Sequence, residues 1–123
     1  MANANILAVV GDLFFVAKIN ETAKQLGVTL KNVTNEAVLM ERAKDKPALI
    51  IFDLNFSAMR PVELISKLKA DAALKDVRLL GFFSHVQTDL KTAAEAAGCD
   101  EVMPRSAFSA NLPEILAAIG KPN

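Results

Sequence analysis

Four polar residues of this chain, each beside a short apolar run, have side chains suited to phosphoryl chemistry. Asp53 stands inside the run "LIIFDLNF", and Asp12, Ser84 and Arg105 each follow another such run. A carboxylate can attack phosphorus where positive charge and a hydrogen-bond donor offset the phosphoryl oxygens. Arg105 can supply the charge and Ser84 the donor, while Asp12 and Asp53 can hold a magnesium ion. These residue types predict a site, provided that the fold brings them together.

The apolar pattern predicts such a fold. Five short runs indicate strands at 6–10, 28–33, 48–52, 77–83 and 100–103. Three of these runs are nearly continuous in apolar residues, as is typical of parallel strands covered on both faces. Helical spacing joins Phe15, Ile19 and Leu26, then Leu90, Ala93, Ala94 and Ala97, then Leu112, Ile115, Leu116 and Ile119. Five strand–helix repeats predict one α/β domain over residues 1–123, a doubly wound sandwich that binds ligands at the carboxyl ends of its strands. The four polar residues should therefore surround one shallow cleft.

Glycines and prolines divide the sequence in agreement with these elements. Gly27 and Gly98 follow helical patterns, where a C-terminal cap requires a positive φ. Pro61 and Pro113 are predicted to lie near helix starts.

The composition excludes several classes of protein. With 14 basic and 14 acidic residues the chain lacks the charge of a nucleic-acid or anionic-membrane binder. One cysteine, Cys99, and one histidine, His85, allow no internal disulfide and no Cys/His zinc site, so Cys99 is predicted to be a core residue. The sequence shows no basic leader and no apolar stretch long enough to cross a bilayer, which predicts a cytoplasmic protein.

Over essentially its whole length the sequence resembles the response-regulator receiver domain, the CheY-like family. The stretch "DLNFSAMRPVEL", residues 53–64, is in register without gaps with the family pattern Asp-Leu-x-Met-Pro-x-Met-Asp-Gly-x-Glu-Leu. Met59, Glu63 and Leu64 match that pattern directly. The stretch "AAEAAGCDEVMPRSAF", residues 93–108, resembles the family's Ala-Gly-Ala-Asp segment and the Lys-Pro-Phe that follows it.

The resemblance assigns roles to individual residues. It makes Asp53 the phosphoacceptor, Ser84 the Ser/Thr that follows the fourth strand, and Arg105 the counterpart of the family's lysine. It implies a magnesium site made by Asp12, Asp53 and the backbone carbonyl of Asn55. It also implies a five-stranded parallel sheet in the flavodoxin-like order 2-1-3-4-5.

The same resemblance implies a function in two-component phosphorelay signalling. The chain would be a stand-alone phosphoprotein without an output domain, and not an enzyme. Its partners would be a histidine kinase or phosphotransfer protein and a downstream target protein, with no role for nucleic acid or membrane. Apolar surface near the fourth helix and fifth strand is a candidate dimer face.

Departures from the family pattern concentrate where the phosphoryl chemistry is done. Gly11-Asp12 leaves one carboxylate where the family has an acidic pair, which predicts weaker magnesium binding. Arg105 replaces a compact ammonium with a planar guanidinium. Ser106 stands at the cis-proline position, with Pro104 before the arginine instead, and Val102 replaces the switch aromatic. These departures favour an alternative, a phosphorylation-independent pseudo-receiver that acts as a protein-interaction module.

Simpler roles remain open for each candidate. Asp53 can cap a loop, Asp12 can cap the first helix through the amides of Phe14 or Phe15, Ser84 can be a turn hydroxyl, and Arg105 can form a surface ion pair. His85 is expected to flank the cleft, since a hydrolase triad with Ser84 and Asp53 lacks the Gly-x-Ser-x-Gly elbow. Phe14, Phe15, Phe82 and Phe83 are expected to cover the sheet. An enzyme or flavin-binding role on the same scaffold is disfavoured, because no glycine-rich loop follows the first strand.

Overall fold

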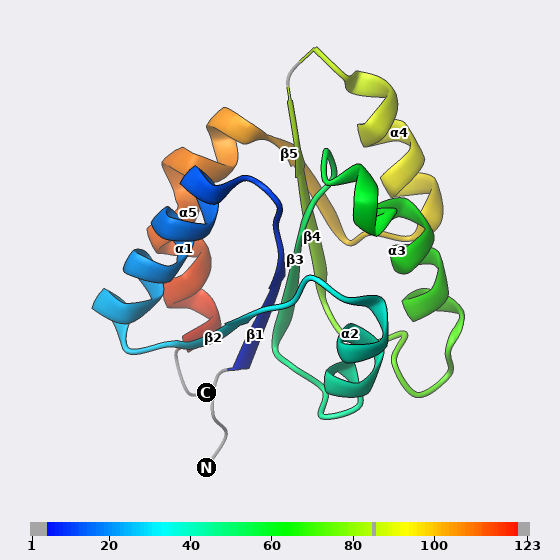
Figure 1. Ribbon diagram of the computed structural model, residues 1–123, viewed down its shortest axis with the longest axis horizontal. Helices are drawn as coiled ribbons and strands as arrows, with labels where there is room; N and C mark the ends of the chain where they lie inside the picture. Colours follow the sequence, from blue (N-terminus) through cyan, green and yellow to red (C-terminus); the bar gives the residue numbers. More distant parts are fainter. Residues whose placement is uncertain (1–4, 85, 121–123) are drawn as a thin grey trace.

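Five parallel strands form one sheet in the order β2-β1-β3-β4-β5 in the computed structural model, which describes residues 5–84 and 86–120 (Figure 1). The strands are β1 (Asn5–Val9), β2 (Thr29–Asn32), β3 (Leu49–Asp53), β4 (Leu79–Phe83) and β5 (Glu101–Pro104). The predicted doubly wound α/β architecture and strand order are confirmed. The predicted strand bounds differ from these by no more than two residues.

Helices cover both faces of the sheet. They are α1 (Leu13–Leu26), α2 (Glu36–Ala43), α3 (Pro61–Ala70), α4 (Thr88–Ala97) and α5 (Arg105–Gly120), with a 3-10 turn η1 (Ser57–Met59). Figure 1 shows α1 and α5 on one face and α2, α3 and α4 on the other. No helix in the described part of the chain is long and apolar enough to cross a membrane.

The central strands are buried on both faces, which explains their unbroken apolar runs. Along β1, Ile6 and Ala8 pack under α1 and α5, whereas Leu7 and Val9 face the layer of α2, α3 and α4. Each of these four side chains is fully buried. Successive residues of a strand point to opposite faces, so a strand covered twice needs apolar residues at every position.

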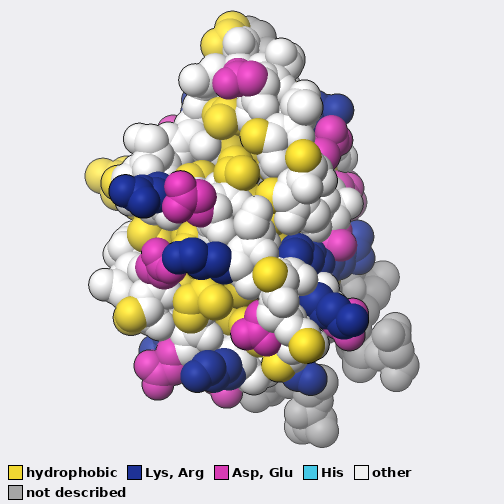
Figure 2. Space-filling view, turned by 90° about the vertical axis from the view of Figure 1, so that its right-hand side faces the viewer, with side chains coloured by type: hydrophobic (Ala, Val, Ile, Leu, Met, Phe, Trp, Pro, Cys, Tyr) yellow, Lys and Arg dark blue, Asp and Glu magenta, His cyan; other side chains and the backbone are white. Residues whose placement is uncertain are grey.

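The surface over α3 and α4 carries charges of both signs. Figure 2 shows this side of the molecule, where basic and acidic side chains lie among scattered hydrophobic ones. Two exposed ion pairs contribute to it, Lys67 with Glu36 and Lys91 with Glu95. This face therefore presents no extended field of one sign.

The prediction for Pro61 is confirmed, but that for Pro113 is wrong. Pro61 is the first residue of α3, whereas Pro113 lies well inside α5. A proline in a helix interior removes one backbone hydrogen bond. Here Phe108, Leu112 and Leu116 continue one fully buried face across that position. The burial of this face keeps the helix intact, with Pro113 exposed on its outer side.

Gly27 and Gly98 cap their helices as predicted. Their φ angles are +70° and +105°, and each backbone N–H returns to the last turn of its helix. A Cβ at position 27 would meet nothing within 4 Å, whereas one at position 98 would lie 2.9 Å from Cγ of Lys69. The space beside Gly27 is therefore open, whereas the Lys69 side chain packs against Gly98.

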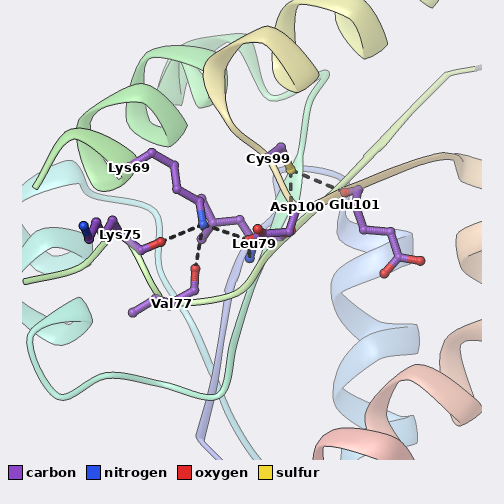
Figure 3. A network of polar contacts seen from close by, with 7 residues as sticks. All are labelled: Lys69, Lys75, Val77, Leu79, Cys99, Asp100 and Glu101. Carbon is purple, nitrogen blue, oxygen red and sulfur yellow. Dashed lines mark hydrogen bonds and ion pairs between the residues drawn. The ribbon is translucent and has the colours of Figure 1, made fainter. Parts of the chain in front are cut away.

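Lys69 cannot move aside easily, because its ammonium group joins three segments (Figure 3). It donates hydrogen bonds to the carbonyls of Lys75 at 2.9 Å and Val77 at 3.2 Å, and to the Asp100 carboxylate at 2.9 Å. The same Asp100 oxygen accepts from the amide of Leu79 at 2.8 Å. This network fixes the entry into β4 against α3 and the start of β5.

Cys99 lies beside this network and is a core residue, as predicted. Its thiol is buried, 3.6 Å from the carbonyl of Leu79 and 3.4 Å from that of Glu101 (Figure 3). Burial raises the pKa of Cys99 from 9.0 to about 11, and the negative charge of Asp100 adds to the rise.

Replacing Gly98 with alanine should destabilise the protein more than replacing Gly27. Alanine at positive φ costs about 1–2 kcal/mol at either cap. At position 98 the new methyl group must also displace the anchored Lys69 side chain, which we expect to add about 1 kcal/mol or more. Urea unfolding of Gly98→Ala and Gly27→Ala measures the difference. Equal losses would show that Lys69 yields freely.

The raised pKa of Cys99 predicts a loss of stability in alkali. Between pH 9.0 and about 11 the unfolded thiol has lost its proton while the folded one keeps it, so the free energy of unfolding should fall as pH rises through this window. Urea midpoints measured across the window should drop more steeply for the wild type than for Cys99→Ala. Parallel curves for the two proteins would contradict the assignment.

Candidate functional site

Asp53 ends β3 as a buried carboxylate. Its side chain is 3% exposed, and among the described residues it is the only buried one that is polar or charged. One carboxylate oxygen accepts from the amide of Gly11 at 3.3 Å, and the other accepts from the amide of Asn55 at 3.0 Å. A buried charge is costly unless hydrogen bonds replace its water. Here the loops after β1 and β3 provide them.

The Asn55 side chain extends this connection to the next loop. Its carbonyl oxygen accepts from the amide of Ser84 at 2.9 Å, and its amide nitrogen donates to the side-chain carbonyl of Gln87. The amide of Gln87 in turn donates to the carbonyl of Ser84 at 2.8 Å. Asn55 therefore ties the end of β3 to the β4–α4 loop.

Asp12 caps α1, so one of the roles left open for it is confirmed. One of its carboxylate oxygens accepts from the amides of Phe14 at 2.9 Å and Phe15 at 3.4 Å. Aspartate is a favoured residue at this position because it satisfies amides that the first helical turn leaves free. The cap turns Phe15 into the core but leaves Phe14 70% exposed. The prediction that Phe14 covers the sheet is wrong.

The ring of Phe56 occupies the space beside Gly11. A Cβ built on Gly11 would lie 2.7, 2.9 and 3.0 Å from three atoms of that ring. A Cβ closer than 3.0 Å to other heavy atoms is not tolerated, so the Phe56 ring or the backbone would have to move. Neither a second acid nor any other side chain therefore fits at position 11 while Phe56 keeps this position.

Arg105, the first residue of α5, lies over an aromatic ring instead of pairing with Asp53. Its guanidinium carbon is 5.5 Å from the centroid of the Phe15 ring. Among the described residues, Arg105 forms no ion pair within 4 Å, and its buried Nε has no hydrogen-bond partner. The cation–π contact contributes about 0.5–1 kcal/mol at such a site.

The predicted single cleft is instead two adjoining depressions. Asp53 and Asn55 line the first depression, Ser84 lines the second, and Asp12 and Arg105 line both. We call the second one the α1–α5 groove, lined by Asp12, Phe14, Phe15, Ser84, Arg105 and the two serines that follow it on α5. The expected set of residues is therefore assembled, but Ser84 does not share a depression with Asp53.

Val102, Ser106 and Pro104 lie at positions where the sequence departs from the receiver pattern. Val102 is half-buried in β5 and packs against the core under α4. Ser106 is the second residue of α5, and Pro104 is the last of β5. The prediction for His85 lies outside the described residues.

The predicted magnesium ligands are oxygen atoms, the type of ligand that this ion prefers. Asp12 and Asp53 line one depression, and magnesium in proteins is usually bound by one or two carboxylates with water at several positions. Each predicted ligand already has a protein partner. Backbone amides bind the Asp12 and Asp53 carboxylates, and the Asn55 carbonyl accepts from the amide of Ser57 at 2.9 Å. The described residues include no cluster of three potential metal-ligating side chains. Asp12 and Asp53 would hold the ion, and water would fill the other positions.

Two features of the site escaped the sequence analysis. The sequence could have pointed to Phe56, because both Phe56 and Gly11 depart from the receiver pattern. Only the structure shows that the Phe56 ring lies against Gly11. Ser109 also lines the α1–α5 groove, at the i+4 spacing from Arg105 that places both on one side of α5.

The fold is that of several solved response-regulator structures. A phosphorylated cyanobacterial phytochrome response regulator superposes with a TM-score of 0.78 at 19% identity, over 96% of this chain and 91% of its own. The receiver domain of a Pseudomonas aeruginosa sensor histidine kinase, with magnesium in its active-site cleft, gives 0.79 at 17% identity, over 98% and 100%. A Burkholderia multivorans response regulator gives 0.75 at 24% identity, over 99% and 98%.

At the level of sequence, neither the family models nor the curated proteins match this chain. The similarity is therefore one of structure, and it extends along nearly the whole chain. The chain has the fold of response-regulator receiver domains.

Proposed function

We propose that this chain is a receiver-type signalling module that acts by binding other proteins and no longer depends on phosphorylation of Asp53. The contact between Gly11 and the Phe56 ring carries this proposal. It removes the space that the second acid of the receiver pattern requires. A site with one acid fewer binds a divalent cation less strongly. Less positive charge is then present to offset the charge of the phosphoryl oxygens.

The surroundings of Asp53 support the same conclusion. A phosphoacceptor needs a reachable oxygen and a cation aimed at the incoming group. Asp53 is 3% exposed, and backbone amides already bind both of its oxygens. The guanidinium of Arg105 lies over Phe15 instead. In this arrangement Asp53 holds loops together.

Asn55 supplies a reason why the module can work without a phosphoryl group. Its side chain holds the amide of Ser84 and the side chain of Gln87. In a phosphorylated receiver, the phosphoryl group on the acceptor aspartate would be expected to change the conformation of this loop. These bonds hold Ser84 and Gln87 in place without a phosphoryl group. Protein partners, a cytoplasmic setting and the absence of enzymatic activity stay predictions.

A second function is favoured by the position of Asp53. It is the buried charged residue at the end of the central strand, in the same depression as Asp12 and Arg105. If a histidine kinase or phosphotransfer protein docks here, an Asp53 oxygen attacks the phosphorus of a phosphohistidine, and the phosphorus–nitrogen bond breaks. The structure of the cyanobacterial relative is that of a phosphorylated protein. This candidate requires Arg105 to turn from Phe15 toward Asp53.

Intact mass after incubation with acetyl phosphate separates the two functions. We expect the wild type to gain no phosphoryl group with or without magnesium, because the site lacks an acid and a directed cation. An authentic CheY-like receiver treated in parallel should gain one. A magnesium-dependent gain in the wild type that Asp53→Asn abolishes would establish the phosphoacceptor function instead.

The signalling role itself has a separate test in cells. A strain without this protein should be restored equally by the wild type and by Asp53→Asn, if the module acts without phosphorylation. Restoration by the wild type alone would contradict the proposal, provided that purified Asp53→Asn unfolds at a similar urea concentration.

Restoring the missing acid should require removal of the ring as well. Gly11→Asp alone should destabilise the fold by about 1–3 kcal/mol, because its Cβ overlaps the Phe56 ring. In a protein that already carries Phe56→Ala, Gly11→Asp should cost less stability than it does in the wild type. The double variant should also bind magnesium more tightly than Phe56→Ala alone. Urea unfolding and magnesium titration calorimetry measure both effects. Additive stability losses would show that the two positions are not matched.

A further inference from the structure

A half-buried cationic side chain, that of Arg105, lines the α1–α5 groove. Nε of Arg105 is buried and, among the described residues, donates no hydrogen bond. A buried donor that is left unsatisfied costs about 1–3 kcal/mol, so native structures nearly always provide an acceptor, from the protein, from water or from a ligand. Arg105 lines the groove, so an acceptor that enters it lies beside the guanidinium.

Further hydrogen-bond donors line the same groove. Ser84 enters from the end of β4, and Ser106 and Ser109 lie on the first turns of α5. The first turn of α5 carries no acidic side chain, so the positive end of its dipole is not neutralised by one. Guanidinium, hydroxyl groups and the start of α5 together form an environment for an anion.

An exposed aromatic side chain forms another wall. The ring of Phe14 is 70% exposed, and it meets the Phe15 ring edge-on with centroids 5.7 Å apart. Phe15 is fixed from behind by Phe82 and Phe108, at 5.1 and 6.1 Å between centroids. Phe15 is therefore held in place, and the exposed Phe14 ring beside it can stack on a ligand. The groove measures about 530 Å³, within the range of small-molecule sites.

Asp12 is the one carboxylate that lines the groove, and it opposes an anion. One of its oxygens is held by the amides of Phe14 and Phe15. The residue therefore provides a sensitive probe: serine also caps helices well, so Asp12→Ser removes the negative charge and keeps the cap.

We propose that the α1–α5 groove binds a small molecule in which one anionic group, a phosphate or a carboxylate, is attached to a flat apolar ring. The anion accepts hydrogen bonds from Arg105 and from the serine hydroxyls of α5. The ring lies against Phe14. This site adjoins the depression that contains Asp53, and Asp12 and Arg105 line both.

Titration of the 15N-labelled chain with phenyl phosphate and with benzoate tests the proposal. We expect amide shifts at Phe14, at Ser84 and along residues 106–109, with the stronger of the two ligands identifying the natural anion. Inorganic phosphate and benzyl alcohol, which each carry half of the chemistry, should bind at least about tenfold more weakly.

Variants assign the interaction to individual groups. Arg105→Gln should weaken binding by about tenfold or more, and Ser109→Ala by a few-fold. Asp12→Ser should strengthen it, an effect that a purely structural role would not produce. Asp53→Asn should leave it unchanged. Each variant is first checked for an unchanged urea midpoint, and Arg105→Lys serves where Arg105→Gln fails that check, with a smaller loss expected.

Several outcomes would overturn the proposal. Shifts centred on Gly11 and Asn55 and insensitive to Ser109→Ala would place the anion in the Asp53 depression. Equal affinity for inorganic phosphate and phenyl phosphate would indicate an adventitious ion only. The absence of shifts with both aromatic ligands, or no change in Arg105→Gln, would show that the groove is not a ligand site.

Discussion

The burial of the Asp53 carboxylate is the constraint on which the carboxyl edge of the sheet depends. A buried charge must find hydrogen bonds, and this one finds them in the amides of Gly11 and Asn55. Those bonds fix the loops after β1 and β3, and the Asn55 side chain then holds the loop after β4 through Ser84. Three loops are thus organised around one acid. Asp53 has a structural reason to be present whether or not it accepts a phosphoryl group.

Much of the fold could be predicted because the signals are local or periodic. Unbroken apolar runs identified the central strands, and Gly27 and Gly98 identified two helix ends, since only a few residues tolerate their backbone conformations. Pro113 shows the limit of this reasoning. Its local preference for a helix start is overruled by the buried face of α5, and burial depends on the tertiary structure.

The site was predictable in its membership but not in its arrangement. Sequence order places Asp12, Asp53, Ser84 and Arg105 at strand ends, and the structure gathers them there. Whether Arg105 faces Asp53 or Phe15 depends on competing contacts of a long side chain, for which the sequence carries no periodic signal. The contact of Phe56 with Gly11 likewise joins residues distant in the chain.

Arg105 lines both depressions and connects them. Its guanidinium lies over Phe15, on the side of the α1–α5 groove that also contains Ser84 and Ser109. An anion in that groove holds the cation there by charge-assisted hydrogen bonds. A phosphoryl group on Asp53 would draw it the other way. If both occur, a ligand in the groove and a phosphoryl group on Asp53 would compete for one side chain. The hydrogen bonds from the amides of Gly11 and Asn55 hold the Asp53 carboxylate without Arg105.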